Sequence, residues 1–129
     1  MLTSSSAQDK PADKPTAAAT VSVPGPRGEF LDYEQRFTRL ADAIPAHKYT
    51  CRPAEGVRSI GELYAHVVSA NYGFAKMLGT DFPAGLDPRA IMATAGDKAK
   101  ILQELKGSFA HMRETILAIK DTDLEKPMK

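Results

Sequence analysis

The sequence lacks the residues for disulfide bonds and has no long apolar run. Cys51 is the only cysteine, and tryptophan is absent. One cysteine cannot form an internal disulfide, so the fold must be stabilised by packing. No apolar run approaches the roughly 20 residues that span a bilayer, and the N-terminus lacks the basic and apolar regions of a signal peptide. We therefore expect no membrane partner and, by default, a cytoplasmic protein, with an exported form left open.

The sequence also lacks an excess of charge of either sign. Its 17 basic and 16 acidic residues are interspersed and leave a formal charge of +1. This balance gives no field strong enough to hold a nucleic-acid backbone, and no base-reading motif occurs, so we expect no nucleic-acid partner. The hydrophobic content of 43% and the charged content of 26% are ordinary for a globular domain. A length of 129 residues allows one such domain.

The first 28 residues contain little that could be buried. They are rich in Ser, Ala, Thr, Pro, Lys and Asp, and four prolines interrupt any regular element. Such a segment cannot offset the entropy cost of becoming ordered. The sequence therefore predicts a disordered tail over residues 1–28 and an ordered domain over residues 29–129.

Three segments of that domain show helical periodicity, because their apolar residues recur at steps of three and four. They span residues 29–44, 59–78 and 97–120, and a short helical turn is predicted to begin at Pro88. Ser59 and Glu62 form a capping box that fixes the start of the second helix. The predicted apolar stripes are Phe30, Tyr33, Phe37, Leu40, Ala41 and Ile44; Ile60, Leu63, Tyr64, Val67, Asn71, Phe74 and Leu78; and Ile101, Leu105, Phe109, Met112, Ile116 and Ile119.

This pattern predicts an all-α bundle with no strand and no internal repeat. Three stripes in about 90 ordered residues make a small core, close to the size at which one core becomes marginal. A fourth helix, from a continuation of the chain or from a partner, would close the bundle. A homodimer is one way of supplying it.

The histidines are the obvious candidates for chemistry, but none is spaced i, i+4 from another as a helical ligand pair would be. His66 lies at the border of the second stripe, so we expect a partly buried imidazole there. We expect His111 to be solvated on the outer face of its helix and His47 to be exposed in a loop. Nothing near Cys51 except Arg52 would activate its thiol, which favours a small buried or half-buried side chain.

One long segment resembles a known family. Residues 49–72 read Tyr-Thr-Cys-Arg-Pro-Ala-Glu-Gly-Val-Arg-Ser-Ile-Gly-Glu-Leu-Tyr-Ala-His-Val-Val-Ser-Ala-Asn-Tyr. An aromatic-x-x-Arg-Pro stretch, then Glu-Gly-Val-Arg-Ser, then a capped helix with an internal histidine is similar to the signature of the DinB superfamily. The helix order and the pair Ser108-Phe109 also agree, so that the resemblance extends over residues 29–127.

The resemblance implies a four-helix bundle that holds a divalent metal, commonly zinc or nickel, with three histidines. His66 matches the first of these ligands. The other two come as an HxxxH pair on a fourth helix, and His47 and His111 do not match those positions. Relatives include thiol transferases and isomerases that act on small molecules. The resemblance thus implies a metal-dependent enzyme with an incomplete site and an unknown reaction. The alternative is a non-catalytic helical module that completes its bundle by self-association or by binding a partner.

Overall fold

A computed structural model describes residues 26–127, so residues 1–25 of the expected tail lie outside the described range. The predicted all-α class is confirmed, since these residues form three long helices, one short helix and two 3-10 turns, with no strand among them. In order, the elements are α1 (Pro26–Ala43), η1 (Ala46–Lys48), α2 (Ile60–Met77), α3 (Pro88–Ala93), α4 (Lys98–Ala118) and η2 (Asp121–Asp123).

α1 ends where Pro45 prevents the helix from continuing. Because proline has no N–H, the carbonyl of Ala41 loses the donor that residue 45 would otherwise supply. The hydroxyl of Tyr49 donates to this carbonyl over 2.6 Å, and Tyr49 itself is fully buried. Tyr49 therefore satisfies the C-terminal end of α1 while filling the core beside α2.

The predicted capping box at the start of α2 is confirmed. The backbone N–H of Glu62 donates to the Ser59 hydroxyl, and the Glu62 carboxylate accepts from the backbone N–H of Ser59 over 2.8 Å. Arg52 extends this arrangement, because its guanidinium binds Glu62 over 2.5 Å and the carbonyl of Val57 over 2.7 Å. The connection between η1 and α2 is thus fastened to the first turn of α2.

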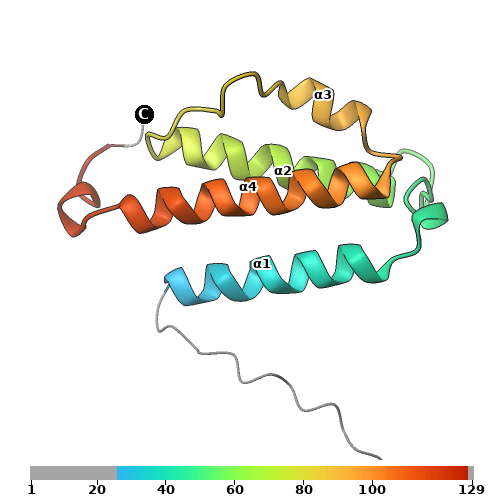
Figure 1. Ribbon diagram of the computed structural model, residues 1–129, viewed down its shortest axis with the longest axis horizontal. Helices are drawn as coiled ribbons and strands as arrows, with labels where there is room; N and C mark the ends of the chain where they lie inside the picture. The colour runs from blue at the N-terminus through green and yellow to red at the C-terminus, as the bar shows by residue number, and fades with distance from the viewer. Residues whose placement is uncertain (1–25, 128–129) are drawn as a thin grey trace, which may run out of the picture.

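α2 and α4 run in the same direction, and α1 runs opposite to both (Figure 1). Parallel neighbouring helices need a long return connection, which residues 78–97 provide with α3 inside it. The short helix predicted at Pro88 is confirmed, with Asp87 as its N-cap, and Asp97 caps α4. Gly61 of α2 lets this connection approach closely, since a Cβ at that position would lie 1.7 Å from the carbonyl oxygen of Ala95.

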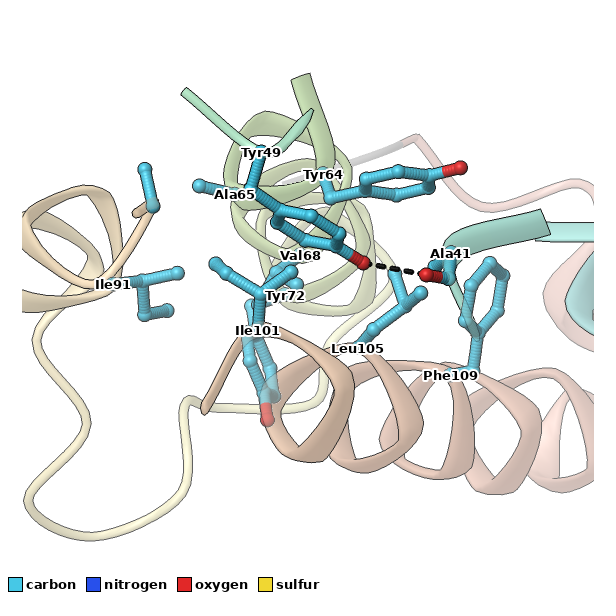
Figure 2. Close-up of a cluster of buried hydrophobic side chains, with 11 residues drawn as sticks. Ala41, Tyr49, Tyr64, Ala65, Val68, Tyr72, Ile91, Ile101, Leu105 and Phe109 are labelled. Atoms are coloured by element: carbon cyan, nitrogen blue, oxygen red, sulfur yellow. Dashed lines mark hydrogen bonds between the residues drawn. The ribbon is translucent and has the colours of Figure 1, made fainter. Parts of the chain in front are cut away.

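The core lies where α2 and α4 face each other, and α1 borders the same core through Ala41 (Figure 2), with Phe30 and Phe37 packed against it. Phe109 of α4 packs against Phe30 and Phe37 of α1, with ring centroids 5.7 and 6.2 Å apart. One polar contact crosses the core, where the Asn71 amide donates to the Ser108 hydroxyl over 3.1 Å. The buried apolar cluster consists of Ala41, Tyr49, Tyr64, Ala65, Val68, Tyr72, Ile91, Ala95, Ile101, Leu105 and Phe109.

Two of the predicted apolar stripes were partly wrong. On α1, Tyr33 and Leu40 are 57% and 56% exposed, because α1 makes its main contact with α4 and these side chains lie away from it. On α2 the buried face is rotated from the predicted one and consists of Gly61, Tyr64, Ala65, Val68, Asn71, Tyr72 and Ala75. The predicted members Leu63, Phe74 and Leu78 are exposed. α2 is therefore apolar over a wider arc than its packing against α3 and α4 uses.

Candidate functional site

His66 projects from the middle of α2 and is exposed. The expectation of a partly buried imidazole was wrong, because the buried face of α2 is centred on Val68 and His66 lies outside it. Within residues 26–127 the imidazole makes no hydrogen bond or ion pair. It is therefore free to act as a ligand or base for a group that approaches α2 from outside.

His111 was expected to be solvated, and this was wrong. Its side chain is half-buried and packs against the ring of Tyr72, with the centroids 5.3 Å apart. The Nε2 atom is buried without a hydrogen-bond partner in the described part of the chain. His111 and His66 belong to different helices, and the structure does not bring them together in one metal-binding group.

The remaining candidates lie at the end of the bundle where η1 connects α1 to α2. His47 is exposed in η1, as expected. Cys51 is also exposed, which contradicts the expectation of a buried or half-buried side chain. The reason is that Tyr49 fills the core at this corner, and the chain then runs over the surface up to Ser59.

Residues 26–127 contain no group of three or more His, Cys, Asp or Glu side chains placed to hold a metal ion. A catalytic zinc ion is held by three protein ligands, and its fourth coordination position stays open for water or substrate. His66 by itself is one donor. The described residues therefore do not fit a complete three-nitrogen metal site, and His66 could serve only as one part of it.

Most of the signature between residues 49 and 72 has a structural role. Gly61 donates its N–H to the carbonyl of Tyr49 over 2.8 Å, next to the hydrogen bond from Tyr49 to α1. The Ser59 N–H and the Arg52 guanidinium lower the pKa of Glu62, because both stabilise its carboxylate. Asn71 is held by Ser108. His66, like Glu55 and Arg58, is thus an exposed polar side chain of this signature that the fold does not use.

A hollow of about 550 Å³ lies at the C-terminal ends of α2 and α4. It contains none of the three histidines, and its wall includes residues Thr115, Leu124 and Lys126. The sequence predicted no structure after residue 120, whereas η2 folds back here with Asp123 accepting from the backbone of Lys120. This turn could have been predicted from Asp123, because an acidic residue three positions after the start of a turn can accept a hydrogen bond from the backbone there.

These features define a class of protein: a helical-bundle domain whose second and third long helices are parallel and joined by a long crossover. The model of the DinB superfamily matches residues 29–129, and the chain belongs to this superfamily. No curated protein and no solved structure gives a significant match to the chain. Along residues 26–127, no helix is long and apolar enough to cross a membrane.

Proposed function

We propose that the protein is a metal-dependent domain of the DinB type and that His66 is one ligand of a divalent ion, zinc or nickel. The observation that carries this proposal is that His66 is exposed on α2 and unused by the fold, while Arg52 and Asn71 of the same signature have structural roles. An imidazole kept free in this way is available to a metal.

The other ligands would have to come from outside residues 26–127, because the described part of the chain offers no cluster that includes His66. The exposed apolar side chains of α2 would let a further helix pack beside His66 and bring imidazoles with it. A small molecule is the substrate class that this proposal favours, since thiol transfer, isomerisation and hydrolysis at a metal all act on one. The bound ion would supply an open coordination position for that chemistry.

Metal titration tests this proposal. Isothermal titration calorimetry with zinc and nickel salts would compare the 129-residue chain with a chain that includes whatever the gene encodes after Lys129. We expect weak binding by the first and tight binding by the second. His66→Ala should weaken the tight binding by at least about 100-fold, whereas the matched control His47→Ala should not change it. Tight binding that survives His66→Ala, or no tight binding by the longer chain, would overturn the proposal.

A second candidate is a non-catalytic helical module that acts by association. It is favoured by the large apolar side chains that α1 and α2 leave exposed, Tyr33, Leu40, Leu63, Phe74 and Met77. Exposed apolar surface of this extent is typical of an interaction face. Loss of metal binding would not affect this candidate, which depends on the apolar face alone.

A further inference from the structure

A polar groove lies between α1 and α4, the antiparallel pair of helices in Figure 1. It has a volume of about 550 Å³, and every residue that lines it belongs to one of these two helices. We call it the α1–α4 groove. Its polar lining consists of Glu34, Gln35, Thr38 and Arg39 of α1 and of Lys106 and Arg113 of α4. Three cations thus face one carboxylate.

This carboxylate is neutralised within the groove. Glu34 accepts two hydrogen bonds from the guanidinium of Arg113, one of them from Nε over 3.1 Å. The side chains of Glu34 and Arg113 are 19% and 39% exposed, so the pair is held against the contact between the two helices. The net positive charge of the groove therefore belongs to Arg39 and Lys106.

The antiparallel arrangement brings Arg39 and Lys106 to the same level of the groove. Phe37 packs against Phe109, so Arg39, two residues further along α1, lies at the level of Gly107, next to Lys106. Within residues 26–127, neither side chain makes a hydrogen bond or an ion pair. The fold therefore places two cations side by side and gives neither of them a counter-charge.

This combination of side chains favours an anion. Two neighbouring cations repel each other, and a negative group between them replaces the repulsion by attraction to both. The Thr38 hydroxyl and the Gln35 amide add neutral donors to the same groove. Since the Glu34 carboxylate is occupied by Arg113, donors exceed free acceptors. The ligand that matches such a lining is rich in acceptor oxygens, as a phosphate group is.

The α1–α4 groove is separate from the exposed apolar side chains of the bundle. Phe37 of α1 packs on α4. At 100° per residue, Glu34 and Thr38 are rotated from Phe37 in one sense around α1. Tyr33 and Leu40 are rotated in the opposite sense and are more than half exposed. A further helix that covers the apolar side chains of α2 and this flank of α1 therefore leaves the groove open.

We propose that the α1–α4 groove binds a small molecule that carries a phosphate group. The phosphate lies between Arg39 and Lys106, and both side chains donate to its oxygens. A volume of about 550 Å³ is typical of a small-molecule site, so the groove has room for an organic part beside Leu31. A nucleic-acid backbone is a poor match, since the cations occupy one groove and form no extended stripe. This site contains no histidine and does not depend on the metal proposal.

Nuclear magnetic resonance of the 129-residue chain tests the inference, with phenyl phosphate and inorganic phosphate as probes. Each probe is compared with sodium chloride at matched ionic strength, which separates binding from screening. We expect saturable changes in the amide signals of residues 34–39 and 106–113. The Kd for phenyl phosphate should be about 1 mM or tighter, the scale that two charge-assisted hydrogen bonds support. Inorganic phosphate should bind more weakly, because it makes no contact with Leu31.

Charge variants locate the site. Arg39→Gln or Lys106→Gln should weaken the binding of phenyl phosphate at least about tenfold, since each removes a charge-assisted hydrogen bond. Arg39→Lys should weaken it less, because the charge is kept. Lys100→Gln is the matched control: Lys100 is an exposed lysine of the same helix that does not line the groove. Arg39 and Lys106 are exposed, so their variants should keep the amide spectrum of the folded chain.

Three results would count against the inference. No saturable change with either probe would overturn the site. An equal loss of binding in Lys100→Gln and Lys106→Gln would show attraction to overall charge and overturn the groove as its location. Equal affinity for the two probes would overturn the organic part of the ligand. All three leave the metal titration unaffected.

Discussion

Gly61 and Gly73 lie in the same helix, and the structure predicts opposite effects when each is replaced by alanine. A Cβ at position 61 would lie 1.7 Å from the carbonyl oxygen of Ala95, which is backbone and cannot rotate away. Since real Cβ contacts do not fall below 3.0 Å, the crossover would have to retreat by about 1.3 Å. A Cβ at position 73 would meet nothing within 4 Å.

The magnitudes follow from two opposing terms. Alanine stabilises a helix interior by about 1 kcal/mol relative to glycine. Overpacking costs about 3 kcal/mol at the upper end of its usual range. Gly61→Ala should therefore destabilise the protein by about 2 kcal/mol or more, and Gly73→Ala should stabilise it by about 1 kcal/mol. In a domain of this size, the melting temperature should fall by roughly 8 °C or more in the first case and rise by roughly 4 °C or more in the second.

Thermal unfolding followed by circular dichroism at one fixed protein concentration would measure both variants, since association would otherwise shift the midpoint. The comparison is internally controlled, because both substitutions make the same chemical change in α2. Equal shifts in the same direction would refute the claim that the crossover is packed against Gly61.

Three further predictions concern single side chains. Tyr49→Phe removes the donor to the carbonyl of Ala41 and should lower the free energy of unfolding in urea by about 1–3 kcal/mol. A decrease of less than about 0.5 kcal/mol would contradict this prediction. The folded state lowers the pKa of Glu62, so its stabilising contribution is present above the unfolded pKa and is lost as the pH falls through the folded pKa. Glu62→Gln should therefore flatten the loss of stability at acidic pH, and an unchanged pH profile would contradict the cap. His66→Ala should change the unfolding free energy by less than about 0.5 kcal/mol, because its side chain is exposed.

The helices could be predicted from the sequence because local signals mark both ends. The Ser59 and Glu62 capping box, the Asp97 cap and the stop at Pro45 act within a few residues of the chain, so periodicity and capping rules suffice. The start of α1 differed by three residues, since Pro26 precedes the first apolar residue of the stripe. A helix end that lacks a capping residue or a proline cannot be placed accurately from apolar periodicity.

The burial of individual side chains could not be predicted in the same way, because it depends on which helices are neighbours. Tyr33 and Phe37 lie on one stripe of α1, but only Phe37 packs against α4. His111 looked exposed by its distance from the stripe, yet Tyr72 of α2 covers it. Cys51 looked buried by residue type, and Tyr49 occupies the core at that corner instead. Each of these errors comes from contacts between residues far apart in the sequence.

α2 gives the most informative error. Its predicted stripe combined residues from two faces, because an apolar arc wider than one helix contact cannot be divided from periodicity alone. The structure divides it: Tyr64 and Asn71 face the core, while Leu63 and Phe74 remain exposed. A helix under selection only to pack against α4 would carry polar residues at the second set of positions. Leu63, Phe74 and Met77 are apolar instead, so α2 carries a second apolar face that the other helices of residues 26–127 leave exposed.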